Sequence, residues 1–103
     1  MDREVEKRVV DAFDALYVAV RRVSEGTASQ DDMKSLAALR DAFLDAFAAL
    51  PNGTDISSVL DLDSVYGLMD MLSGGMDMIA SEGNTDEPGW DRFMDIIRDA
   101  VEV

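Results

Sequence analysis

Carboxylates are the most abundant side chains in this chain that could do chemistry. The chain has 22 Asp and Glu, nine Lys and Arg, and neither His nor Cys. Nucleophile systems of the Ser-His-Asp and Cys-His types therefore cannot form, and zinc lacks its preferred ligands. Two carboxylates could act as general acid and base, but a small helical chain offers little cleft for a substrate. We therefore expect a protein that is not an enzyme.

Metal binding is the other chemistry open to carboxylates. Residues 84–95 match part of an EF-hand calcium loop, but Pro88 supplies no ligand at the fifth position and Asp91 occupies the usually apolar eighth position. Asp61 and Asp63 could hold Mg²⁺ or Ca²⁺ only weakly, like most neighbouring carboxylates. We therefore predict no metal site and no cofactor.

The acidic residues are concentrated where basic residues are missing. Residues 41–91 hold eleven carboxylates and no Lys or Arg, and the net charge is −3 over residues 1–50 but −10 over residues 51–103. A field of one sign destabilises the compact state by self-repulsion. It indicates either a surface for a cationic partner or adaptation to salt or to a GC-rich genome, since Asp outnumbers Glu 16 to 6 and Arg outnumbers Lys 7 to 2.

Size and overall charge limit the class of protein. A chain of 103 residues, 48% hydrophobic, fits one globular domain spanning residues 1–103. A net charge of −13 with few, dispersed bases argues against direct binding of nucleic acid or of an anionic membrane. No apolar run approaches the roughly 20 residues of a membrane span, and the charged N-terminus is unlike a signal peptide. The absence of Cys fits the cytoplasm.

The spacing of apolar residues predicts an all-α fold, a compact four-helix bundle, with up-down order in the simplest case. The helices are expected at about residues 2–24, 30–50, 63–80 and 88–102. Gly26 should end the first helix, and Ser29 with Asp32 resembles a capping box for the second. Arg40 falls near a buried stripe, with its head either in water or paired with an acid of another helix. The expected core includes Phe43, Phe47, Leu68, Leu72, Trp90 and Phe93.

The third helix should carry three stripes. Val65, Leu68, Met69, Leu72, Met76 and Ile79 form the main apolar stripe, with Asp63, Asp70 and Asp77 opposite it. A second apolar seam consists of Leu60, Gly67, Met71, Gly74 and Met78. Its two glycines each cost a helix about 1 kcal/mol relative to Ala, but they let another helix approach closely.

This pattern predicts that the third helix is packed on two sides. It is either the central helix of a monomer, or it meets the core on one side and a second copy on the other, in a homodimer. The competing interpretation is that Ser73, Gly74 and Gly75 break or kink it.

The fourth helix should carry a row of acids, Asp91, Asp95 and Asp99. Like charges at this spacing destabilise a helix by roughly 0.2–0.5 kcal/mol per pair. Successive carboxylates stand about 6 Å apart along the axis, whereas each DNA strand presents a phosphate about every 3.4 Å. The row is thus a coarse imitation of a phosphate backbone, or else an acidic solvated face that keeps the protein soluble.

The leading hypothesis is a binding protein that docks Asp63, Asp70, Asp77, Asp91, Asp95 and Asp99 on a basic surface of a nucleic-acid-binding partner. In its type of surface such a protein resembles phage-encoded anti-CRISPR and anti-restriction inhibitors, which implies blockade of the partner. The alternative is a small oligomeric adaptor or antitoxin-like protein that uses the Met and Gly seam. In that case the acidity would reflect salt or genome adaptation.

Overall fold

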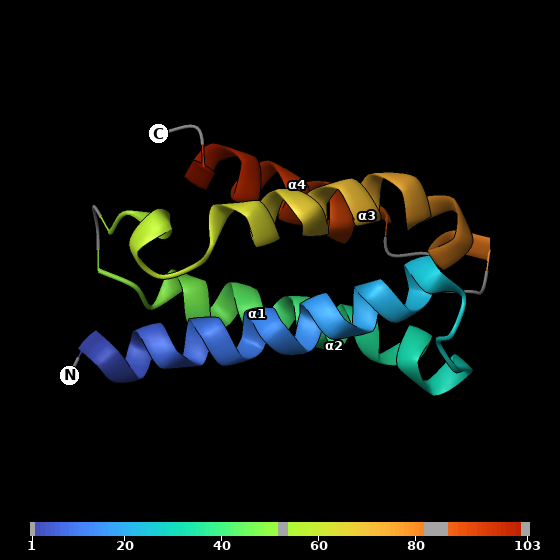
Figure 1. The fold of residues 1–103 in the computed structure, drawn as a ribbon, viewed down its shortest axis with the longest axis horizontal. Helices are drawn as coiled ribbons and strands as arrows, with labels where there is room; N and C mark the ends of the chain where they lie inside the picture. The colour runs from blue at the N-terminus through green and yellow to red at the C-terminus, as the bar shows by residue number, and fades with distance from the viewer. Residues whose placement is uncertain (1, 52–53, 82–86, 102–103) are drawn as a thin grey trace.

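The computed structural model describes residues 2–51, 54–81 and 87–101, of which residues 2, 75–81, 87 and 88 are described by their backbone alone. These residues form the predicted all-α bundle (Figure 1). Its elements are α1 (Asp2–Glu25), α2 (Gln30–Ala48), the 3-10 turn η1 (Ile56–Ser58), α3 (Leu62–Ser81) and α4 (Glu87–Val101). The helix ends lie within two residues of the predicted bounds.

Local chemistry sets the turn between α1 and α2. Gly26 adopts a positive φ of 74°, which ends α1 as predicted. The amide of Thr27 then donates to the carbonyl oxygen of Arg22 at 2.8 Å. The capping box of α2 is also confirmed. The Asp32 amide donates to Ser29 Oγ at 3.1 Å, and the Ser29 amide donates to Asp32 Oδ2 at 3.0 Å.

The four helices lie in two layers, α1 with α2 and α3 with α4 (Figure 1). Helix α1 packs on α2 and on α3, and α4 packs on α2, α3 and η1. The helices alternate in direction along the chain, yet α3 lies beside α1, and α2 lies beside α4. The simplest up-down order, in which α3 would neighbour α2, is therefore not followed. The connector through η1 is long enough to cross the bundle diagonally, and η1 anchors it on α4.

Aromatic rings join the two layers in the core. The ring of Phe43 lies 5.9 Å from each of the rings of Phe13, Phe47 and Phe93. The rings of Trp90 and Phe93 meet edge to face at 5.8 Å and 77°, a favoured geometry for aromatic pairs. Five of the six predicted core residues are fully buried, and Phe47 is partly buried against them.

Arg40 is buried, with only 5% of its surface exposed. Its Nη2 lies 2.9 Å from Oδ1 of Asp41, and its guanidinium carbon lies 5.0 Å from the centre of the Trp90 ring. The prediction that its head lies in water is therefore wrong, because the guanidinium is buried. Asp41 belongs to the same helix, so this pair does not test the predicted pairing with an acid of another helix. The Trp90 face on α4 also attracts the cation, an interaction worth about 2 kcal/mol when desolvated.

Helix α3 is continuous through Gly74 and Gly75, so the predicted break there is wrong. It begins at Leu62, directly after Asp61. The carbonyl of Asp61 accepts from the Val65 amide at 3.1 Å. The prediction that α3 is packed on two sides is confirmed, since α1 and α4 flank it.

Candidate acidic binding surface

The outer face of α3 carries the carboxylates predicted for it. Asp63 and Asp70 are exposed, whereas Val65 and Leu68 on the opposite side of the helix are fully buried. The seven-residue spacing keeps such side chains on one face, because seven residues are nearly two helical turns. The side chain of Asp77 lies outside the described residues.

The carboxylates of α4 are exposed as well. Asp91, Asp95 and Asp99 all face solvent, while Trp90 and Phe93 are fully buried. Four residues turn a helix through about 400°, so each step along this row drifts by about 40°. The row consequently drifts by about 80° across the exposed side of α4 between Asp91 and Asp99.

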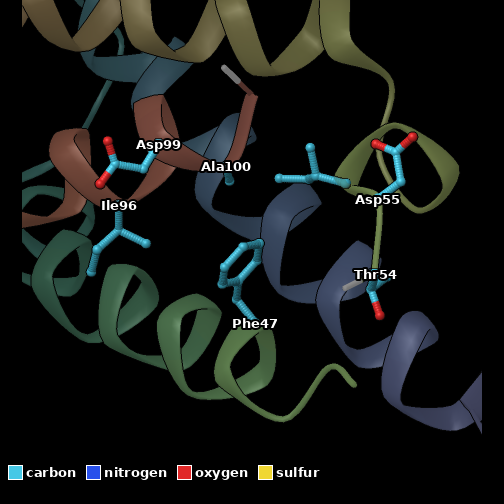
Figure 2. Close-up of a pocket in the computed structure, with 7 residues that line it drawn as sticks. Phe47, Thr54, Asp55, Ile96, Asp99 and Ala100 are labelled. Carbon is cyan, nitrogen blue, oxygen red and sulfur yellow. The ribbon is translucent and has the colours of Figure 1, made fainter. Parts of the chain in front are cut away.

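This drift divides the row between two hollows. Asp91 and Asp95 line a hollow of about 520 Å³ between α4 and α3, where Leu72 and Ser73 form the α3 wall. Asp99 instead lies at a second hollow, on the side of α4 that faces η1 and the end of α2 (Figure 2). We call Asp63, Asp70, Asp91, Asp95 and Asp99 together the acidic face.

Of the two bases of α4, Arg98 lines the same hollow as Asp91 and Asp95, and Arg92 lies on another side of the helix. Nη1 of Arg98 lies 3.7 Å from Oδ1 of Asp95, and both side chains are more than half exposed. Such a surface pair contributes little free energy. Arg92 faces α2, where it lines a third hollow with Asp41 and Asp45. Because α3 contains no Lys or Arg, the α3 part of the acidic face has no base on its own helix.

Asp55 is an anion near the acidic face that the sequence reasoning did not select. It precedes η1, and its Oδ1 accepts from the Ser57 amide at 3.1 Å. Hydrogen bonds from the Ser57 side chain and backbone hold the pKa of Asp55 below its ordinary value. An Asp side chain that accepts from the backbone amide two residues later is a common turn motif, but the position of Asp55 beside α4 depends on the diagonal connector.

The predicted oligomer seam is largely covered within the monomer. Leu60 is 5% exposed, and Met71 is partly buried against the core. A Cβ on Gly67 would lie 3.7 Å from the Tyr17 hydroxyl of α1, whereas a Cβ on Gly74 would meet nothing within 4 Å. The side chain of Met78 is outside the described part of the chain. Gly74 is thus the described member of the seam that remains open.

Within residues 2–51, 54–81 and 87–101, no three carboxylates lie close enough together to hold a metal ion. Residues 82–86, which include part of the EF-hand-like stretch, lie outside these ranges. Among the helices that the structure describes, none combines the length and the apolar character needed to cross a bilayer.

Comparisons with protein-family models, with curated proteins and with solved structures gave no match to this chain. Its function must therefore be inferred from its own surface.

Proposed function

We propose that this chain is a non-enzymatic cytoplasmic protein that docks its acidic face on a basic, nucleic-acid-binding surface of a partner protein and blocks it. The observation that carries the proposal is the placement of exposed carboxylates on two adjacent antiparallel helices, with a hollow between them. Asp63 and Asp70 stand on α3, and Asp91 and Asp95 stand on α4.

Electrostatics explains how such a surface would compete with nucleic acid. A groove built for phosphates holds Lys and Arg, and these gain free energy when an anionic ligand releases bound counterions. Complementary charge also speeds diffusional encounter and selects partners of the opposite sign. Carboxylates about 6 Å apart along α4 present fewer charges than a DNA strand, but α3 supplies a second row alongside.

The uneven distribution of charge favours this proposal over general solubility. Solubility requires only a net charge, and charges of both signs dispersed over the whole surface would provide it. Here the bases are gathered in the first half, and the stretch from residue 41 to residue 91 has none. In its type of surface the chain resembles anti-CRISPR and anti-restriction inhibitors, and we propose blockade of that kind.

Affinity capture with a nucleic-acid competitor tests the proposal. The full-length chain is immobilised and exposed to a host lysate at low salt, and bound proteins are eluted with double-stranded DNA. We expect DNA to release a nucleic-acid-binding protein, because both ligands would occupy the same basic groove. Raising the salt should release the same protein, since salt screens exposed charges beyond about a Debye length.

A matched pair of variants separates the acidic face from net charge. One variant carries Asn at the five positions of the acidic face. The control carries Glu4→Gln, Asp11→Asn, Asp14→Asn, Asp31→Asn and Asp45→Asn, five exposed acids of α1 and α2. The first should lose the DNA-releasable protein and the second should keep it. Equal retention by both, or a bound protein that DNA does not release, would contradict the proposal.

A further inference from the structure

A second hollow lies at the end of the bundle where α2, η1 and α4 meet (Figure 2). Its volume is about 600 Å³, within the range of about 300–1,000 Å³ typical of pockets that bind small organic groups. Four apolar side chains from three elements line it: Phe47, Ile56, Ile96 and Ala100. The diagonal connector creates this pocket, because it brings η1 against α4.

Two carboxylates stand at opposite sides of the pocket, Asp99 on α4 and Asp55 before η1 (Figure 2). The Ser57 amide donates a hydrogen bond of 3.1 Å to Asp55 Oδ1, and this bond fixes the position of the Asp55 side chain. None of the described residues that line the pocket is a Lys or an Arg. The pocket therefore combines an apolar floor with two anions at its rim, and the described residues of its lining supply no cation.

We infer that this pocket is the anchor site for an apolar side chain of the basic partner, one flanked in sequence by Arg or Lys. The inference rests on the proposed function, because it deepens the description of that partner. Interfaces concentrate their binding energy in a few apolar or aromatic anchors that fill pockets, surrounded by polar contacts. Here Asp55 and Asp99 would receive the flanking cations while the side chain between them contacts Phe47.

Charge complementarity selects this occupant over the others that the apolar floor would accept. A nucleic acid or an acidic peptide would be repelled by both rim carboxylates. A second copy of the chain also carries a net charge of −13, so association between copies is opposed by the same field. An uncharged apolar compound could fill the floor but would gain nothing from the rim.

Three capped tripeptides serve as probes of the pocket. Acetylated and amidated Arg-Phe-Arg, Arg-Ala-Arg and Glu-Phe-Glu are titrated at low salt into the full chain labelled with ¹⁵N, and backbone amide shifts are followed. Arg-Phe-Arg should shift the amides of Phe47, Thr54, Ile96 and Ala100. It should bind about tenfold or more tightly than Arg-Ala-Arg, because it buries an aromatic ring. Glu-Phe-Glu should leave these amides unchanged.

Two substitutions sharpen the test. Ala100→Phe fills the pocket from α4 and should remove the preference for Arg-Phe-Arg over Arg-Ala-Arg. Asp99→Asn, at an exposed position that does not endanger folding, should weaken Arg-Phe-Arg about two- to fivefold. Its matched control is Asp63→Asn, which removes the same charge from α3 and should change that affinity by less than about twofold.

The outcomes separate the pocket from the proposed function. If both Arg peptides bind equally and shift only amides around Asp70 and Asp91, the acidic face stands and the pocket inference is wrong. If neither peptide shifts any amide, both proposals are contradicted. Equal binding of Glu-Phe-Glu would show an apolar ligand without a charge requirement. Pocket shifts that grow with protein concentration alone would show a second copy, and either result overturns the inference.

Discussion

The two layers of the molecule share one core but differ in how many basic residues accompany their acids. Helices α1 and α2 carry seven of the nine bases in the chain. They also hold ion pairs, with Arg21 Nε 2.9 Å from Glu25 Oε1 and Arg22 Nη1 3.8 Å from Asp32 Oδ1. Helices α3 and α4 have two bases, and Arg98 forms a pair at 3.7 Å. Burial is nevertheless alike in the two layers, which both supply fully buried residues.

This difference between the layers indicates that the fold does not require the acidic surface of α3 and α4. The core needs apolar stripes at helical spacing, and both layers provide them. A row of like charges instead costs a helix roughly 0.2–0.5 kcal/mol per neighbouring pair. The α4 row thus has an unfavourable repulsion, and the proposed cationic partner would account for that cost.

The largest effect should come from removing the ring that joins the layers. Phe43→Ala should lower the free energy of unfolding by about 3–5 kcal/mol, because it leaves a cavity among aromatic rings of α1, α2 and α4. Urea unfolding followed by Trp90 fluorescence and by circular dichroism measures it. Phe47→Ala, at a partly buried position, should lower the free energy of unfolding by a smaller amount. Separate transitions for the two probes would show that the layers unfold independently, contrary to a shared core.

The next largest effect concerns the contact of Arg40 with Trp90 across the layers. Arg40→Ala should lower the free energy of unfolding by about 2–3 kcal/mol, because it removes a desolvated cation–π contact and a packed stem. Asp41→Asn should cost less than about 1 kcal/mol, since Asp41 is exposed. Urea titration of both variants decides between the two contacts. Equal losses would assign the stabilisation to the ion pair within α2.

A gain of stability is expected at Gly74 in α3. Gly74→Ala should raise the free energy of unfolding by about 0.5–1 kcal/mol, because the position is helical and a Cβ would meet nothing within 4 Å. Gly67→Ala serves as the control, with its Cβ in ordinary contact with Tyr17. Thermal unfolding gives the stability, and sedimentation gives the mass. A dimer that dissociates only in Gly74→Ala would show that the seam holds two copies together.

The smallest effects should come from two capping carboxylates, Asp32 in the first turn of α2 and Asp55 before η1. A hydrogen bond from the Ser29 backbone lowers the pKa of Asp32, and hydrogen bonds from Ser57 lower the pKa of Asp55. A carboxyl with a lowered pKa stabilises the fold fully above its ordinary value of 3.8. That contribution is lost as the pH falls through the lower pKa of the folded state.

Stability against pH in Asp32→Asn and Asp55→Asn checks these caps. The free energy of unfolding of the wild-type protein should fall as the pH drops below 3.8, and in each variant this fall should be smaller. An unchanged profile in both variants would contradict the assigned pKa shifts. A change in Asp55→Asn alone would place the acid sensitivity in the connector to α3.

Short-range patterns were enough to predict the helices and much of the core. The Ser29 capping box and the Gly26 stop depend on neighbouring residues, so the sequence contains them completely. The contact of Arg40 with Trp90 joins residues 50 positions apart and depends on the neighbour order of the helices, which the apolar stripes do not specify. The path of the diagonal connector also depends on this neighbour order. The pocket beside Asp55, which the connector creates, could therefore not be predicted from the stripes either.

The sequence predicted which residues of the candidate surface are exposed better than it predicted how those residues are arranged in space. Exposure of Asp63 and Asp70 follows from their position opposite an apolar stripe. The drift of the α4 row could also be predicted from the sequence, because 3.6 residues per turn imply a shift at four-residue spacing. The hollow between Asp91 and Leu72 could not be predicted from the sequence, because it forms only when α4 packs against α3.

The central claim is that the layer of α3 and α4 is made to meet a cationic surface, and the salt dependence of partner binding tests it most directly. The affinity for the DNA-releasable partner is measured against salt concentration for wild type and for the two five-site variants. We predict a steep fall for wild type and for the α1–α2 control, and weak binding with a flatter slope for the acidic-face variant. Identical slopes and affinities for all three proteins would contradict the account.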